Sequence, residues 1–325
     1  PPRSTLFPYT TLFRSTASPS DLCFVAPAAL QANSAIPLQS CSHEVPRHNL
    51  LDSDDGQCRW LSKVYELLQK DNIDKDDNIS WSAHFAALQP AVPRPPAITG
   101  LLPLFRDSAH SVAMVLHGMN MISKAIDHVN PSQMPVLTVD QPLYAIAKKI
   151  QWTWPDTYGD GKFVVLMGGL HIEMAMLKVL GEWLDGSGWT AAIVNADVIT
   201  SGRADGLLKG SHTSQAQWAH QVTAAALFKL KKDAYHAYTC KHSDSLMSPV
   251  TFLDWCNDKA EKHPQFLYWN KILELELLFL QFLRSQREGH FLLNIETLRR
   301  IVPWMFAMDH YHYSRWLTVH AQDLQ

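Results

Sequence analysis

One acidic residue stands where a ligand could reach it at the end of a predicted strand. Asp140 follows the short apolar run Val136–Val139, and Gln141 then opens a helical pattern. In open α/β sheets, ligands bind beyond the carboxyl ends of the strands, and a carboxylate there can hold a hard divalent cation. Asp140 therefore either binds a metal ion or only stabilises the positive N-terminus of the helix that follows it.

A glycine turn with a histidine follows the next predicted strand in the same way. Gly168-Gly169-Leu170-His171 comes directly after the apolar run Phe163–Met167. Two glycines allow a tight turn and expose backbone N–H groups at a helix start, where an anion can bind. The turn is not a P-loop, because no Lys-Ser/Thr pair follows it. His171 is either a metal ligand or general base, or a packing residue bonded to a nearby carbonyl.

Glu276 is the most informative acid of the C-terminal half. It lies in the mostly apolar run Ile272–Leu280. At about 100° per residue, Glu276 shares the apolar side of a helix with Ile272 and Phe279, whereas Glu274 lies on the polar side. A buried carboxylate must be paired, metal-bound or protonated. Glu276 is thus either a metal ligand, or the acid of a buried salt bridge to Arg or Lys or of a hydrogen bond with Tyr or Trp.

The composition is that of a globular protein. The sequence has 325 residues, 46% of them hydrophobic, and a net charge of −3. No apolar stretch approaches the roughly 18 residues that a membrane span needs. The near-neutral charge, without a basic block, argues against tight DNA binding. The five cysteines are far apart, which favours a reducing compartment, so we expect an intracellular protein of the nucleus or cytoplasm.

Three segments differ in composition. Residues Arg3–Ser15 resemble one reading frame of a sequencing-library adapter, so residues 1–15 are set apart from the fold. Residues 16–96 are rich in Ser, Pro, Asp and Asn. They predict a poorly ordered segment with one short helix at Trp60–Gln69 and a proline-rich linker at Pro90–Pro96. Residues 97–325 form the expected α/β plus helical domain, and we expect the chain to be truncated at both ends.

The pattern of elements in residues 97–325 predicts an α/β fold with a small parallel sheet. Strands are expected at Pro135–Val139, Phe163–Met167 and Thr190–Ile199, with helices at Met114–Val129, from Asp140 to Gln151 and at Leu170–Leu184. Alternation of strands and helices is typical of parallel sheets. The C-terminal half is predominantly helical, with helices expected over residues 205–240, 251–262, 265–288, 291–301 and 303–321.

Four segments of the chain together match a known sequence pattern: residues 135–147 (PVLTVDQPLYAIA), 163–174 (FVVLMGGLHIEM), 220–226 (HQVTAAA) and 302–317 (VPWMFAMDHYHYSRWL). These segments resemble a large family of uncharacterised proteins that occur in repeat-rich invertebrate genomes and are associated with mobile elements. The resemblance covers residues 97–325. More distantly, the strand that ends in Asp-Gln and the later strand that leads to Leu-His are similar to transposase domains with an RNase-H-like fold.

That distant resemblance implies a metal-dependent site. An RNase-H-like fold carries acidic residues that bind two Mg²⁺ ions for phosphodiester chemistry. Matched by position, Asp140 would be the acid of the first strand and Glu276 the late helical acid. No aspartate stands near His171 at the second strand, so Glu173 or Asp197 would have to replace it.

Two main functions follow. The first is a transposon-encoded, transposase-related protein with DNA as partner, in which Asp140, His171 and Glu276 are catalytic and Asp140 and Glu276 bind Mg²⁺. The second is a non-catalytic or degenerate protein-interaction domain. It would neutralise Glu276 in a salt bridge and present the aromatic C-terminal helix, with Tyr313, Trp316 and His320 on one face, to a protein partner. A small-molecule enzyme built on the glycine turn is a third reading.

Overall fold

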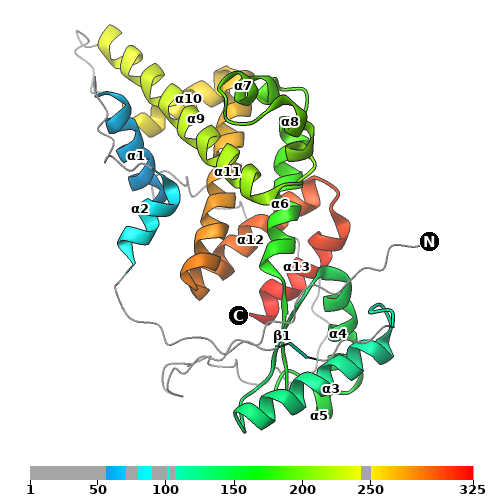
Figure 1. The fold of residues 1–325 in the computed structure, drawn as a ribbon. Helices are drawn as coiled ribbons and strands as arrows, with labels where there is room; N and C mark the ends of the chain where they lie inside the picture. Colours follow the sequence, from blue (N-terminus) through cyan, green and yellow to red (C-terminus); the bar gives the residue numbers. More distant parts are fainter. Residues whose placement is uncertain (1–55, 71–79, 90–100, 103–106, 243–249, 325) are drawn as a thin grey trace, which may run out of the picture. The chain divides into compact units, whose positions relative to one another are not determined.

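The computed structural model describes residues 56–70, 80–89, 101–102, 107–242 and 250–324. The predicted adapter segment and proline-rich linker lie outside these residues. The chain divides into two compact units: unit 1 comprises residues 1–38, 91–172 and 311–325, and unit 2 comprises residues 39–90 and 173–310. Figure 1 labels the helices and strands of the two units.

Unit 1 is built on two parallel strands. β1 (Val136–Val139) pairs with β2 (Val164–Met167), and Val136 lies opposite Val164 in the register. Parallel strands need a crossover connection, which α4 (Gln141–Thr153) and the short α5 (Pro155–Tyr158) supply. The predicted small parallel sheet is confirmed at these two strands.

Helix α4 starts where β1 ends because the sequence caps it there. The Asp140 carboxylate accepts a hydrogen bond from the backbone N–H of Leu143, at 3.1 Å. Pro142 occupies the first turn of α4. A backbone N–H at that position would have no acceptor within the helix, so its absence in proline costs no hydrogen bond. α3 (Val112–Val129) and α13 (Tyr311–Asp323) both contact α4, and α13 also contacts β2.

A buried ammonium group connects α13 to α4. The Lys148 side chain is 2% exposed, and its Nζ lies 3.2 Å from a carboxylate oxygen of Asp160 and 3.0 Å from one of Asp323. The Tyr144 hydroxyl donates to the same Asp323 oxygen at 3.0 Å. Since Asp160 and Asp323 pair with this buried cation, the loss of Asp323 would leave its charge partly uncompensated and weaken the docking of α13.

The aromatic face of α13 packs inside unit 1. The Trp316 ring stacks on Trp152, with centroids 6.1 Å apart, and meets the edge of Tyr144 at 5.9 Å. His320 is buried beside the Tyr144 ring at 5.5 Å. These side chains therefore contribute to the packing of the unit, and a protein partner for this face stays a prediction.

Unit 2 is helical in all of its described parts. Its core surrounds α11 (Pro264–Glu288), which contacts α9 (Thr213–Lys241), α10 (Phe252–Lys262) and α12 (Phe291–Ala307). The middle of α11, from Ile272 to Leu283, is buried at almost every position. A helix that is apolar nearly all round belongs in a core. The other helices are α1 (Gly56–Leu68), α2 (Trp81–Leu88), α6 (Gly169–Leu184, which begins in unit 1), α7 (Trp189–Asn195) and α8 (Ser201–Leu208).

The third predicted strand is wrong, because residues 189–195 form α7. Gly188 precedes this helix with φ of 85°, a conformation that glycine adopts without strain. Trp189 and Ile193 are four residues apart and both buried, the spacing of one helical face. A short apolar run does not distinguish a strand from a buried helix. At residues 189–195, the four-residue spacing of the two buried side chains is the pattern that matches the structure.

The prediction that a helix ends before Pro303 is also wrong. Pro303 lies inside α12, where it removes one backbone hydrogen bond. Ile301 and Met305 on either side of it are fully buried. Their packing holds the helix together across the proline. In the segment predicted to be poorly ordered, α1 confirms the predicted helix and α2 is an additional one.

The buried His320 makes the stability of unit 1 depend on pH. Burial, followed by the charge of Lys148, lowers the pKa of His320 from 6.5 to about 4. The folded state therefore binds fewer protons than the unfolded state between these values, and stability is lost as the pH falls from 6.5 to about 4. At roughly 1.4 kcal/mol per pKa unit, we expect a loss of about 3 kcal/mol. Urea unfolding followed by tryptophan fluorescence should show this loss, and His320→Gln should reduce it. Equal pH slopes for both proteins would contradict the assignment.

Candidate functional site

The carboxyl ends of β1 and β2 bring Asp140 and His171 to the same edge of the sheet, as the sequence predicted. The N–H of Gly168 donates to the Val139 carbonyl at 2.7 Å, which ties the glycine turn to the end of β1. A Cβ on Gly168 would lie only 3.3 Å from that carbonyl oxygen, so glycine permits the close approach. Tyr313 of α13 faces this edge too, and burial, aided by the Asp140 charge, raises the pKa of its hydroxyl.

The edge holds fewer metal ligands than the sequence hypothesis requires. One Asp140 oxygen caps α4. The proposed substitute Glu173 belongs to unit 2, where its buried carboxylate accepts a hydrogen bond from Gln217 at 2.6 Å. Asp197 also belongs to unit 2 and follows α7. Within the described ranges, no three His, Cys, Asp or Glu side chains gather in a way that could hold a metal ion. Magnesium binding by Asp140 stays a prediction.

Glu276 is buried in the core of unit 2, as its place on the apolar helix face predicts. Its carboxylate is 0% exposed, and Oε1 lies 2.9 Å from Nδ1 of the equally buried His220 on α9. Burial raises the pKa of the Glu276 carboxyl, and the charge and hydrogen bond of His220 oppose that rise. Its partner is thus a histidine, whereas the sequence hypothesis named Arg, Lys, Tyr or Trp.

Aromatic rings enclose the His220–Glu276 pair. The His220 ring stacks on Trp189 with centroids 5.3 Å apart, and it meets Phe279 edge-on at 5.7 Å. Among the described residues, Nε2 of His220 and Oε2 of Glu276 have no hydrogen-bond partner. The pair therefore satisfies one polar atom of each residue and is sealed by apolar surface. The catalytic roles of Glu276 and His171 stay predictions, and the surroundings of Glu276 favour the structural alternative.

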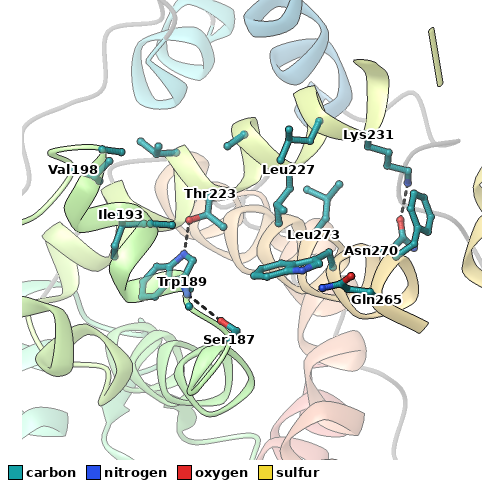
Figure 2. Close-up of a pocket in the computed structure, with 18 of the residues that line it drawn as sticks. Ser187, Trp189, Ile193, Val198, Thr223, Leu227, Lys231, Gln265, Asn270 and Leu273 are labelled. Atoms are coloured by element: carbon teal, nitrogen blue, oxygen red, sulfur yellow. Dashed lines mark hydrogen bonds between the residues drawn. The ribbon is translucent and has the colours of Figure 1, made fainter. Parts of the chain in front are cut away.

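An apolar pocket of about 650 Å³ opens in unit 2 between α7, α9 and the first half of α11. Figure 2 shows Trp189 and Ile193 at one end, Leu227 and Leu273 in the middle, and Lys231 with Asn270 at the other end. Most of the side chains that line the pocket are apolar; these include Ala192, Ile193, Val198, Val222, Ala226, Leu227, Leu230, Phe266, Trp269 and Leu273. No pattern in the sequence predicted this pocket.

The pocket ends where the buried pair begins. Trp189 lines the pocket and stacks on His220, and its indole N–H donates to the Thr223 hydroxyl at 2.8 Å. Thr223 in turn donates to the Ala219 carbonyl at 2.8 Å. His220 lies three residues before Thr223 on α9, and Glu276 three residues after Leu273 on α11. The pair thus holds Trp189 in place as the inner wall of the pocket.

The opposite end of the pocket is polar. Nζ of Lys231 donates to Oδ1 of Asn270 at 2.7 Å (Figure 2). Burial lowers the pKa of Lys231 from 10.5. The pocket therefore combines a long apolar wall with one buried cation, an arrangement typical of binding sites in which few polar groups orient an apolar molecule.

If the His220–Glu276 pair is structural, its loss should destabilise the protein. Glu276→Ala removes the acceptor of a buried imidazole and leaves a cavity, so we expect a loss of about 3–5 kcal/mol in the free energy of unfolding. Glu276→Gln keeps an acceptor oxygen and should lose much less. Glu274→Ala, on the polar side of α11, is the matched control and should lose less than about 1 kcal/mol. Urea unfolding measures all three. A stable Glu276→Ala protein that no longer binds Mg²⁺ would instead support the metal role.

The comparisons with known proteins concern the family only. No curated protein and no solved structure matches the chain. None of the described helices is long and apolar enough to cross a membrane. A family model described as a domain of unknown function, DUF8702, matches residues 80–250 and 231–325. These matches take in both strands and the pocket, and the chain belongs to the DUF8702 family.

Proposed function

We propose that this chain is a non-catalytic binding protein whose ligand site is the apolar pocket of unit 2. The observation that carries the proposal is the pocket itself. Its volume of about 650 Å³ lies inside the range of roughly 300–1,000 Å³ that small-molecule sites occupy. Its long apolar wall and single polar end suit an elongated, mainly apolar small molecule.

Exposed apolar side chains at the pocket support this proposal. Leu230 lines the pocket and is 65% exposed. A ligand that covers such surface gains about 25 cal/mol for each Å² of apolar area removed from water. The rigid placement of Trp189 by Thr223 and His220 means that the inner wall is formed before a ligand arrives. A preformed wall lowers the cost of ordering on binding.

The surroundings of the acids support binding over catalysis. The Glu276 carboxylate is bound to His220 and closed off from solvent. Asp140 and His171 belong to unit 1, whereas Glu276 belongs to unit 2. The pair behind Trp189 thus accounts for Glu276 as a structural residue of the pocket wall.

Filling the pocket should weaken ligand binding without unfolding the protein. Ala226 lines the pocket and is exposed, so Ala226→Trp places an indole in the pocket with little strain on the core. We expect at least about a tenfold weaker affinity for the neutral apolar dye N-phenyl-1-naphthylamine, which corresponds to about 1.4 kcal/mol. Fluorescence titration of the full chain measures it.

Ala237→Trp is the matched control, because Ala237 is exposed on the same helix and lies outside the pocket lining. This variant should bind the dye as the unchanged protein does. Equal affinity of all three proteins, or no dye binding at all, would overturn the proposal.

A second candidate is the transposase-related protein with metal-dependent phosphodiester chemistry. The observation in its favour is the parallel pair β1–β2, which places Asp140 and His171 at one carboxyl edge. An RNase-H-like fold with DNA as substrate and Mg²⁺ as cofactor belongs to this second proposal. In it, Glu276 would have to leave His220 before it could act as a metal ligand.

Asp140→Asn tests the second candidate cleanly. Asparagine caps a helix about as well as aspartate does, so the variant keeps the start of α4 and loses only the charge. If Asp140 binds Mg²⁺, then Mg²⁺ should raise the midpoint of thermal unfolding of the unchanged protein and not that of Asp140→Asn. Identical responses to Mg²⁺ would remove Asp140 from the list of metal ligands.

A further inference from the structure

The ammonium group of Lys231 is buried, and it donates its hydrogen bond to a neutral amide. The residue is 7% exposed and lines the polar end of the pocket. Its Nζ donates to Oδ1 of Asn270 at 2.7 Å and stands 5.4 Å from the centre of the Phe252 ring. The Cys256 thiol on α10 lies close enough to hydrogen-bond to it. The amide and the aromatic face solvate this cation without neutralising it. The charges of Cys256 and Glu274 favour the protonated form of Lys231, but the effect of burial is larger and the pKa stays lowered.

The carboxylate of Glu274, whose charge acts on Lys231, is already paired with other residues. Oε1 of Glu274 accepts a hydrogen bond from the Asn270 side-chain amide at 2.9 Å, and Oε2 pairs with Lys271 at 2.7 Å. Glu274 therefore influences Lys231 only through Asn270 and through space. In the part of the chain that the structure describes, no carboxylate forms an ion pair with Lys231.

The buried Lys148 has carboxylate partners of the kind that Lys231 lacks among the described residues. Lys148 in unit 1 has two aspartate partners within 3.2 Å. A buried cation without an anion is costly, because burial favours its neutral form. That cost is visible in the pKa of Lys231, which burial lowers. An anion bound at this end of the pocket would give Lys231 the anionic partner that Asp160 and Asp323 give Lys148.

We propose that the pocket ligand is an amphipathic anion, with one anionic head group bound to Lys231 and an apolar tail that extends towards Trp189. This inference rests on the proposed function of the pocket. Along α9, Lys231 lies eight residues after Thr223, or about 12 Å at 1.5 Å per residue. A medium-length alkyl chain fits that span, and the walls between the two ends are apolar. Carboxylate is the simplest such head group.

Three probes with the same tail and different head charges test this inference. Decanoate, decanol and decylammonium are titrated into the full chain, each in competition with the neutral dye and below its micelle concentration. We expect decanoate to bind at least about tenfold more tightly than decanol, and decylammonium more weakly than both. Lys231→Met should abolish the preference for decanoate over decanol. Lys241→Met is the control, because Lys241 is exposed at the end of the same helix and outside the pocket.

The outcomes separate the two proposals. If all three probes compete equally and Lys231→Met affects none, the head-group assignment fails while the pocket function stands. If no probe competes and Ala226→Trp has no effect on dye binding, the pocket function fails as well. A third outcome is a dimer of the full chain that Ala226→Trp converts to a monomer. That result would contradict both proposals, because a second copy would then occupy the pocket.

Discussion

The burial of α11 is the constraint on which unit 2 depends. From Ile272 to Leu283 this helix is surrounded by other helices, so each polar residue on it must find a partner inside the protein. Glu276 finds His220, and Gln281 accepts a hydrogen bond from Arg300 at 3.0 Å. Glu274, two residues before Glu276, is half-buried at the edge of this region and pairs with Lys271. Two acids of one helix thus have different environments because of their place around its axis.

The same burial shapes the pocket. Where α11 emerges from the core, its residues Phe266, Trp269 and Leu273 face α9 across the pocket. Trp189 closes the inner end, held by His220 behind it and by Thr223 beside it. Lys231 and Asn270 close the outer end. The core pair and the pocket are therefore adjoining parts of one arrangement, which the contact between His220 and Trp189 connects.

Much of the fold could be predicted from the sequence, because it is written in local patterns. Asp140 and Pro142 mark the start of α4, and the β-branched run before them marks β1. The place of Glu276 on the apolar face predicts its burial. The identity of its partner could not be predicted, since His220 lies 56 residues away in the sequence. A local pattern does not show which residues so far apart come into contact. The segment at residues 189–195 misled because β-branched and apolar residues fit a strand or a short buried helix equally well.

The pocket could not be predicted either, because its residues carry no local pattern of their own. Its lining comes from three helices and the segments that flank α7, and it consists mainly of alanine, leucine and aromatic residues. In a sequence, such residues are indistinguishable from those of a core. Lys231 is one of several lysines on α9, and only the structure separates it from Lys229, which pairs with Asp233 at 2.5 Å. A buried cation is recognised by its surroundings and not by its residue type. The acid Asp140 could be predicted as a candidate site because an acid at the end of a strand matches a known metal-binding pattern. The residues that line the pocket match no such pattern.

The most direct test of the account is to see where an amphipathic anion binds. In a ¹⁵N-labelled full chain, each tryptophan indole N–H gives its own NMR signal, and Trp189 and Trp269 line the pocket whereas Trp152 belongs to unit 1. The account predicts that decanoate shifts the signals of Trp189 and Trp269, leaves that of Trp152 unchanged, and loses this effect in Ala226→Trp. Shifts at Trp152 alone, or no shift at Trp189 and Trp269 at saturating decanoate, would contradict it.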